Sequence, residues 1–220
     1  MKVGVIHATT TAVDPMVRAF QQESKEVELL HFMDTGLLTM LGKEGSLTPE
    51  IIRRFSLLLN LAAQSDVDCI QLTCSAFNDV TDILQPLYPV KLFRSDEAML
   101  DEALEYERIG LVSSLRETPV ALQGYLERKK PGVHVESLVE PGLIHLLFHG
   151  KKEQHDKQVR NMIQQLDGKV DVIVLSQYSM EHVADQVHCS VPLLTAPGAS
   201  AKRCRAYLQN VKGGILWREK

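Results

Sequence analysis

Short apolar runs rich in Val, Ile and Leu alternate with longer, helix-like stretches along most of the chain. Such runs are typical of the buried strands of a parallel sheet. The longer stretches between them are typical of the helices that cover such a sheet. The runs predict strands at Val3–Ile6, Val27–Phe32, Cys69–Thr73, Val90–Phe93, Ile109–Val112, Val133–Val139, Val172–Ser176 and Val191–Thr195. Helices are expected near Asp14–Lys25, Pro49–Ala63, Glu97–Glu107, Thr118–Lys130, Gln154–Leu166 and Ala199–Asn210. This alternation predicts an α/β fold.

The order of these elements repeats once along the chain. Gly4 in the run VGVI corresponds to Gly110 in the run IGLV, at an offset of 106 residues. Three further pairs follow in the same order: Asp34–Leu38 with Glu140–Ile144, Asp68–Ser75 with Asp171–Tyr178, and Pro89–Phe93 with Ser190–Leu194. The repeat predicts two similar Rossmann-like lobes with parallel four-stranded sheets, related by a pseudo-twofold axis. The first lobe is expected to comprise residues 1–95 plus 200–220, and the second residues 96–199.

Open parallel sheets bind ligands at the carboxyl ends of their strands, so two such lobes predict an active-site cleft between them. The residues that follow the predicted strands are rich in hydroxyl and amide groups. These groups bind carboxylates without a fixed charge, although the same residue types also cap helices. The candidate substrate-binding residues are Thr9, Thr10, Ser75, Asn78, Ser113, Ser114, Thr118, Tyr178 and Ser179.

Composition excludes several classes of function. The hydrophobic fraction of 45% allows a packed core, and the net charge of −4 comes with scattered Lys and Arg residues rather than a basic patch. We therefore expect no nucleic-acid partner. No apolar run has the length of a signal peptide or a membrane span, so we expect a cytoplasmic protein without membrane contact.

The cysteines and histidines do not form a metal-binding pattern. The four cysteines include no C-x-x-C pair, and reduced thiols are the default in the cytoplasm. His145 and His149 lie four residues apart, but no third ligand accompanies them. No G-x-G-x-x-G motif follows either opening strand. The sequence therefore predicts neither a metal nor a nucleotide cofactor, and only Cys74 occupies the end of a predicted strand.

The segment DCIQLTCSA around Cys74 resembles the first cysteine motif of the aspartate/glutamate racemase superfamily. DVIVLSQYS resembles the second motif, VGVIHATT the opening strand, and IGLVSSLRET the opening strand of the second domain. The resemblance extends from Val3 to about Tyr207. Relatives in this superfamily include racemases of aspartate, glutamate and hydantoins, a maleate isomerase and an arylmalonate decarboxylase.

This resemblance implies chemistry without pyridoxal phosphate or a metal, and a site to which Cys74, His7 and Gln177 contribute. In two-cysteine relatives one thiolate removes the proton beside a carboxylate while the opposite thiol donates one. Here Cys74 fills the first cysteine position, but Gln177 stands at the second, and glutamine cannot shuttle protons at neutral pH. His7 stands where glutamate racemases carry an acidic residue, and it is a candidate to activate or orient Cys74.

The departure at Gln177 leaves several functions open. An isomerase or racemase acting beside a carboxylate is the first hypothesis, with Cys74 as acid and base. A one-base decarboxylase or lyase of the same superfamily is the second. The third is a two-lobed carboxylate-binding protein that has lost turnover. The expected partner is a small carboxylate, and a homodimer is possible by analogy with relatives.

Overall fold

The computed structural model describes residues 1–213, so the last residues of the segment assigned to the first lobe, 214–220, lie outside the described part. The chain divides into two compact units. The first comprises Met1–Ser95 and the segment that begins at Ser200, and the second comprises Asp96–Ala199. Each unit contains one four-stranded sheet in which all the pairs are parallel. The predicted α/β class is therefore confirmed.

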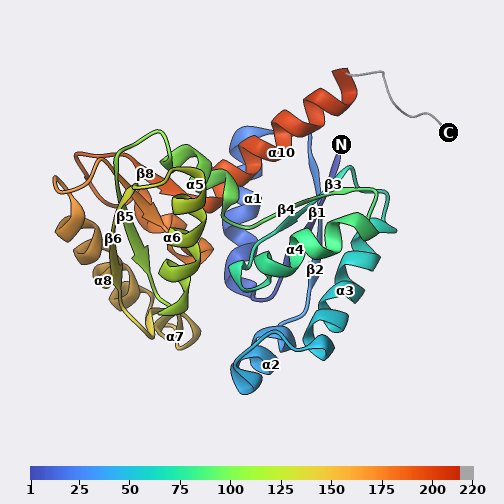
Figure 1. Ribbon diagram of the computed structural model, residues 1–220, viewed down its shortest axis with the longest axis horizontal. Helices are drawn as coiled ribbons and strands as arrows, with labels where there is room; N and C mark the ends of the chain where they lie inside the picture. The colour runs from blue at the N-terminus through green and yellow to red at the C-terminus, as the bar shows by residue number, and fades with distance from the viewer. Residues whose placement is uncertain (214–220) are drawn as a thin grey trace. The chain divides into compact units, whose positions relative to one another are not determined.

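The first unit has the strand order β2-β1-β3-β4. Its strands are β1 (Lys2–His7), β2 (Glu28–Met33), β3 (Cys69–Leu72) and β4 (Lys91–Phe93). Its helices are η1 (Thr10–Ala12), α1 (Val13–Glu23), α2 (Gly36–Glu44), α3 (Pro49–Ala63), η2 (Ser75–Phe77), α4 (Asn78–Leu84) and η3 (Gln85–Leu87). Helices α3 and α4 cover the same face of this sheet and share one apolar core with it (Figure 1).

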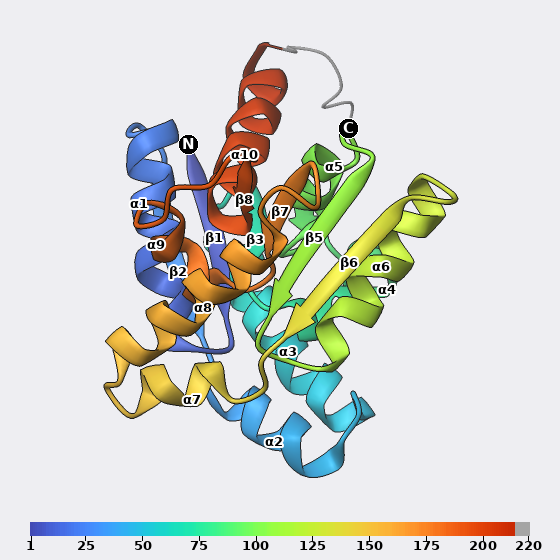
Figure 2. The ribbon, with the colours of Figure 1, turned by 90° about the vertical axis from the view of Figure 1, so that its left-hand side faces the viewer.

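The second unit repeats this order as β6-β5-β7-β8. Its strands are β5 (Arg108–Ser113), β6 (His134–Val139), β7 (Val172–Leu175) and β8 (Leu193–Thr195). Its helices are α5 (Glu97–Ala103), α6 (Glu117–Lys129), α7 (Leu143–Phe148), α8 (Lys152–Leu166), η4 (Tyr178–Met180) and α9 (Glu181–Ala184). Figure 2 shows β5 and β6 side by side in this sheet. The last helix, α10 (Ala196–Gly213), begins in the second unit and continues in the first.

The two units repeat their backbone contacts as well as their strand order. The Asp68 N–H donates to the Lys2 carbonyl at 2.9 Å, and the Asp171 N–H donates to the Arg108 carbonyl at 2.7 Å. Each aspartate also accepts the return bond through Oδ2, from Lys2 N at 2.8 Å and from Arg108 N at 2.9 Å. The repeat seen in the sequence is therefore a repeat of hydrogen-bonded structure.

The matched glycines of the two opening strands lie where a helix packs close to the sheet. A Cβ atom on Gly4 would lie 3.3 Å from Ala62 Cβ, at the end of α3. A Cβ atom on Gly110 would lie 3.0 Å from Leu166 Cδ1, at the end of α8. A larger residue would require these side chains to move by a few tenths of an ångström, so glycine suits the close approach of helix and sheet at this strand position.

All eight predicted strands are present, and six predicted helices match helices of the structure within a few residues at most ends. Helices α2, α4 and α9 were not predicted, and α7 was indicated only by the spacing of His145 and His149, which suits one face of a half-exposed helix. Each has at most nine residues, which is too short for a clear apolar period. Within residues 1–213, no helix combines the length and the apolar character that crossing a membrane requires.

Candidate functional site

Cys74 and Gln177 occupy equivalent backbone positions in the two units. Cys74 follows β3 and is the N-cap residue of η2, with φ −129° and ψ 116°. Gln177 follows β7 and is the N-cap residue of η4, with φ −115° and ψ 143°. Both residues therefore leave the carboxyl end of the third strand in extended conformation and begin a short helix. The offset of 103 residues in the sequence correctly paired these two positions.

Cys74 lies against the apolar core of the first unit and is partly exposed. It lines a small recess at the carboxyl end of the sheet, with an empty volume of about 180 Å³ that is too narrow to hold a water molecule. The recess is lined by Ile6, His7, Ala8, Leu37, Phe55, Leu72, Cys74 and Phe77.

The other three cysteines lie in different environments. Cys69 and Cys204 are fully buried, and the hydrogen bond between them, together with burial, raises the pKa of the Cys204 thiol. Cys189 lies before β8, at the amino end of the sheet of the second unit, and burial raises the pKa of its thiol. Cys74 is therefore the one cysteine of the chain at the carboxyl end of a sheet.

His7 is the last residue of β1 and is completely buried. Its Nε2 lies 2.9 Å from Nδ1 of His31, a residue of the neighbouring strand β2, and the two rings are stacked. Its Nδ1 lies 3.1 Å from Oγ1 of Thr73, the residue before Cys74. Both ring nitrogens of His7 thus have partners within the first unit.

Burial, with a smaller contribution from His31, lowers the pKa of His7 to about 4. Burial also lowers the pKa of His31. His7 is therefore neutral at neutral pH, and a neutral ring carries one N–H to share between its two partners. This arrangement fixes the His7 ring next to the strand end that carries Cys74, and it places no charge there.

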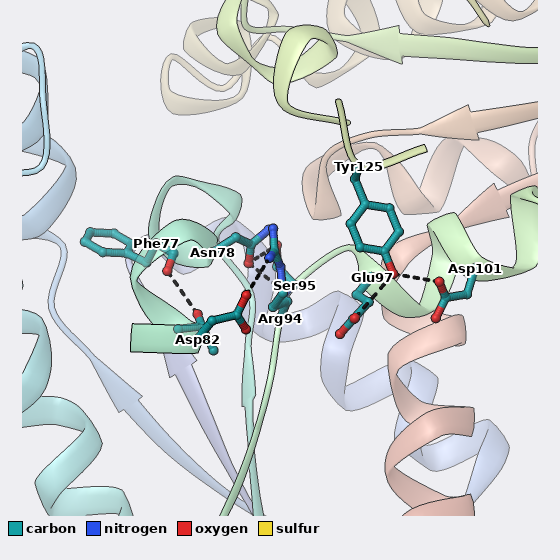
Figure 3. Close-up of polar contacts among 9 residues, drawn as sticks. Phe77, Asn78, Asp82, Arg94, Ser95, Glu97, Asp101 and Tyr125 are labelled. Atoms are coloured by element: carbon teal, nitrogen blue, oxygen red, sulfur yellow. Dashed lines mark hydrogen bonds and ion pairs between the residues drawn. The ribbon is translucent and has the colours of Figure 1, made fainter. Parts of the chain in front are cut away.

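The other candidate residues of the first unit form local contacts. Thr9 caps η1 by accepting from the Thr11 N–H at 3.4 Å, and Thr10 is exposed at the start of that helix. Ser75 begins η2 and is partly exposed. Asn78 begins α4, and its Oδ1 accepts from the Ser95 N–H at 3.0 Å, which ties α4 to the end of β4 (Figure 3). Thr9 and Asn78 thus have at least a capping or tethering role.

The Gln177 side chain is held by three residues of its own unit. Its Oε1 accepts from the Ser114 N–H at 2.9 Å, and its Nε2 donates to Ser113 Oγ at 3.1 Å and to Thr118 Oγ1 at 3.4 Å. The structure therefore brings four of the predicted site residues into one hydrogen-bonded group. In this group the amide closes the loop between β5 and α6, and no member can exchange a proton at neutral pH.

Two buried hydroxyls flank this group. Among the described residues, Ser114 Oγ and Ser176 Oγ have no hydrogen-bond partner. Buried hydroxyls without a partner are rare. Tyr178 and Ser179 are buried in η4, immediately after Gln177.

A buried carboxylate fastens α9, which directly follows η4, to α8. Asp156 Oδ1 accepts from His155 Nδ1 at 2.8 Å and from His182 Nε2 at 2.7 Å, and Oδ2 pairs with Lys152. Burial alone would raise the pKa of Asp156, but hydrogen bonds from these three residues outweigh it and lower the pKa to about 2. The carboxylate therefore stays charged over the whole physiological range of pH.

Among the described residues, one group has ligand atoms close enough together to be considered as a metal site. It consists of His155, Asp156 and His182, whose ligand atoms all lie within 4.8 Å of one another. Zinc at its usual bond lengths would hold N and O ligands roughly 3.3 Å apart. The observed N–O distances of 2.7 and 2.8 Å are those of hydrogen bonds, and Lys152 already balances the carboxylate. The chemistry of this group fits a structural clamp rather than a cation site.

Sequence reasoning did not find His31, Thr73 or Asp156. Parallel pairing places Val5 of β1 beside His31 of β2. His7 lies two residues after Val5, and residues two apart on a strand share a face, so the His7 ring lies next to the His31 ring. Asp156 and His182 are 26 residues apart, on two helices. A histidine in each of two strands was the available signal, but strand register is a tertiary property that one sequence does not supply.

Comparison with solved structures shows that the chain has the fold of amino-acid racemases. An aspartate racemase from Picrophilus torridus matches with a TM-score of 0.73 and 12% identity, over 99% of this chain and 96% of that one. A glutamate racemase from Francisella tularensis, in complex with D-glutamate, matches with 0.70 and 13%, over 100% and 84%. An allantoin racemase from Klebsiella pneumoniae matches with 0.71 and 16%, over 97% and 89%.

No protein-family model and no curated protein sequence matches the chain. The predicted resemblance to the aspartate/glutamate racemase superfamily is thus confirmed at the level of the fold, across nearly the whole chain.

Proposed function

We propose that this protein is a cofactor-independent enzyme of the racemase and isomerase type, which acts at the carbon adjacent to a carboxylate of a small amino acid or dicarboxylate. The observation that carries the proposal is the position of Cys74. It is a partly exposed thiol at the carboxyl end of a parallel sheet, in a fold shared with aspartate, glutamate and allantoin racemases. The complex of one such racemase with D-glutamate supports a small carboxylate as the ligand.

In the proposed reaction the Cys74 thiolate removes the proton from the carbon beside the carboxylate. The S–H bond forms as the C–H bond breaks, and the electron pair delocalises into the carboxylate. Return of a proton from sulfur to the same face restores the starting configuration, whereas inversion requires a second donor to protonate the opposite face while Cys74 keeps the abstracted proton. In either case no oxidant or reductant is consumed. A thiol is suited to this step because its pKa lies close enough to neutral pH for both protonation states to be accessible.

Residues of the first unit near Cys74 have supporting roles in this proposal. His7 is neutral and held on both ring nitrogens, so it shapes the thiol's surroundings rather than forming an ion pair with it. Ser75 and Thr9 would bind the substrate carboxylate together with backbone N–H groups.

The hydrogen bonding of Gln177 favours a second candidate. Its amide is fully engaged by Ser113, Ser114 and Thr118, and it has no proton to exchange at neutral pH. A one-base decarboxylase or lyase, in which Cys74 protonates a planar intermediate from one face, needs no acid at position 177. A carboxylate-binding protein without turnover would also be compatible with this amide.

Hydrogen exchange in heavy water distinguishes these functions. The native protein is incubated with aspartate, glutamate, a hydantoin, malonate and other small dicarboxylates, and the products are analysed for deuterium and for chirality. Deuterium incorporation with inversion supports racemisation, and incorporation with retention or loss of CO₂ supports one-face chemistry. Binding without any exchange across the panel would contradict the enzyme hypothesis and favour the binding protein.

The role of Cys74 is tested on the same preparation. Brief iodoacetamide treatment should abolish hydrogen exchange to the same extent as it alkylates Cys74. Peptide mapping measures the alkylated fraction of each cysteine. Cys69 and Cys204 should remain protected because they are fully buried. Full exchange after complete alkylation of Cys74 would exclude this thiol from the reaction.

A further inference from the structure

His31, an exposed residue of β2, is the outer end of a chain of hydrogen bonds that reaches the residue before Cys74. Its Nδ1 lies 2.9 Å from Nε2 of the buried His7. On the other side of the His7 ring, Nδ1 lies 3.1 Å from Thr73 Oγ1. The Thr73 hydroxyl in turn donates to the carbonyl of Ile6 at 3.1 Å. The chain therefore links three neighbouring strands, β2, β1 and β3, near their carboxyl ends.

The donors in this chain all point the same way. A hydroxyl has one proton to donate, so Thr73 Oγ1, which donates to the Ile6 carbonyl, must accept from His7. The proton of the neutral His7 ring is therefore on Nδ1, and its Nε2 is left as an acceptor. His31 must then donate from Nδ1 to that nitrogen. Each residue thus fixes the hydrogen bonding of the next one, from His31 inwards.

The inner end of the chain anchors the backbone that carries Cys74. The ladder between β1 and β3 ends at the pair of Ile6 and Leu72. Beyond this pair, both the N–H and the hydroxyl of Thr73 donate to the Ile6 carbonyl, each at 3.1 Å. His7 and Cys74 also line the same narrow recess. A shift of His7 or Thr73 would therefore move the neighbouring thiol.

The second unit shows that the fold does not require this chain. Strand register and backbone hydrogen bonds pair the three positions with serines: His31 with Ser137, His7 with Ser113 and Thr73 with Ser176. Ser137 accepts from Gln123 at 2.8 Å instead. Ser176 Oγ has no hydrogen-bond partner in the part of the chain that the structure describes. The chain of two histidines and a threonine is thus specific to the unit that carries the thiol.

The difference matches the side chain at the next position. Gln177 anchors itself, because its amide bonds to Ser113, Ser114 and Thr118. A thiol is a weak hydrogen-bonding group and cannot anchor itself in this way. The unit that carries Cys74 therefore fixes the same strand end through neighbouring side chains.

We propose that His31 is a positioning residue for Cys74, which holds the strand end that carries the thiol through His7 and Thr73. The effect of His31 on turnover rests on the proposed function, whereas its effect on the reactivity of the thiol does not.

Two variants of His31 separate the loss of its hydrogen bond from the loss of its ring. His31→Leu removes the donor to His7. His31→Asn removes the ring but retains a donor, because an asparagine amide N–H can occupy the place of the histidine Nδ1–H. His134→Leu is the matched control, because His134 is an exposed histidine on β6, the equivalent edge strand of the second unit. Circular dichroism of each variant checks that the fold is retained.

The rate at which iodoacetamide alkylates Cys74 tests the positioning without any substrate. His31→Leu should raise this rate about two- to tenfold, the equivalent of one net hydrogen bond lost from the strand end. His31→Asn and His134→Leu should keep the native rate. A native rate in His31→Leu would overturn the positioning role, whether or not a substrate is found.

Steady-state kinetics with the substrate found in the exchange experiment tests the effect on turnover. His31→Leu should lower kcat by about tenfold or more at nearly unchanged KM, because a misplaced thiol reacts slowly with a substrate that still binds. His31→Asn should restore most of kcat. A native kcat in His31→Leu would overturn the role of His31 in the reaction.

Nitrogen-15 NMR of the histidine side chains tests the direction of the chain. At mildly alkaline pH, His7 and His31 of the native protein should both carry their proton on Nδ1. A proton on Nε2 of His7 would overturn the inward direction of the chain.

Discussion

The two units have nearly the same backbone and different chemistry at the ends of their equivalent strands. In the first unit β1 ends in His7 and β3 is followed by Cys74. In the second unit β5 ends in Ser113, and Gln177 stands at the position of Cys74. The groups that can exchange protons are thus in the first unit, while the second holds an amide and hydroxyls fixed by hydrogen bonds.

This contrast separates the residues that the fold requires in both units from those that can differ between them. Gly4 and Gly110 match because at both positions a helix side chain lies close enough to crowd an added Cβ atom. Asp68 and Asp171 are both retained because each closes the same pair of backbone bonds. Strand-end side chains carry no such packing requirement, so they can diverge while the backbone that presents them stays the same.

The units also differ in how they bury ionisable groups. The first buries His7 in its neutral form, at a pKa of about 4. The second buries Asp156 in its charged form, at a pKa of about 2, because three donors surround it. The second unit also buries His155, whose pKa burial lowers, so acid should weaken both units through their histidines, while Asp156 stays charged until a much lower pH.

The largest expected effect follows from removing the thiol of the first unit. Cys74→Ser should reduce turnover by about 10²–10⁴-fold, as expected for the loss of a general acid and base, because a hydroxyl does not ionise near neutral pH. Steady-state kinetics with the substrate found in the exchange experiment measures it. Cys189→Ser is the control and should retain native activity, since Cys189 lies at the opposite end of a sheet. A native turnover number in Cys74→Ser would show that the first unit is not the reacting half.

The sequence predicted the fold well because the strands are buried and their apolar runs are continuous. It also paired Cys74 with Gln177 correctly, because glycines and acidic residues fix the offset of the repeat. The hydrogen bonds of Gln177 could not be predicted, because they depend on the loop conformations after β5 and β7. The contact between His7 and His31 depends on strand register, and the contact between Asp156 and His182 on the packing of two helices.

Loss of the buried carboxylate should destabilise the second unit. Asp156→Asn should lower the free energy of unfolding by about 3 kcal/mol, because the side chain loses its negative charge and one of its two acceptor oxygens, so the Lys152 ammonium is left without its counter-ion. Urea denaturation measures the change, and hydrogen exchange should locate it in peptides of α8 and α9. Glu107→Gln is the control: Glu107 pairs with Lys130 but is 80% exposed, and such surface pairs contribute at most about 1 kcal/mol. Equal effects of the two variants would refute the clamp.

Acid should weaken the first unit in a range set by His7. The folded pKa of about 4 lies below the ordinary value of 6.5, so between these pH values the unfolded chain binds the proton and the folded chain does not. Stability therefore falls as the pH is lowered from 6.5 to 4, by on the order of 3 kcal/mol in total. Burial also lowers the pKa of His31 in the first unit and of His155 in the second, and each adds a loss in the same direction.

His7→Asn should remove most of this pH dependence, whereas His134→Asn, at an exposed position on β6, should leave it unchanged. Urea denaturation at pH 7 and at pH 4.5 gives the difference. NMR of the imidazole resonances gives the pKa of His7 directly in the native protein. A titration midpoint near 6.5 would contradict the burial of a neutral ring.

Gln177→Cys should have the smallest effect on stability. It is also the most direct test of the chemical difference between the two units. The shorter side chain leaves the buried Ser114 N–H without its acceptor, which should cost about 1–3 kcal/mol. Gln177→Met is the control, because it loses the same bond without adding a thiol.

The Gln177→Cys variant also places a thiol, which can act as acid and base, at the position of the second unit that is equivalent to Cys74. Inversion needs a proton donor on the face opposite the acceptor, and glutamine cannot be that donor. If both strand ends serve one substrate, Gln177→Cys should gain inversion of aspartate or glutamate in heavy water, and Gln177→Met should not. Exchange with retention in the native protein, followed by inversion in Gln177→Cys, would show that one residue separates one-face from two-face chemistry. Efficient inversion by the native protein would instead require a second base other than position 177, with Tyr178 and His7 the residues to substitute next.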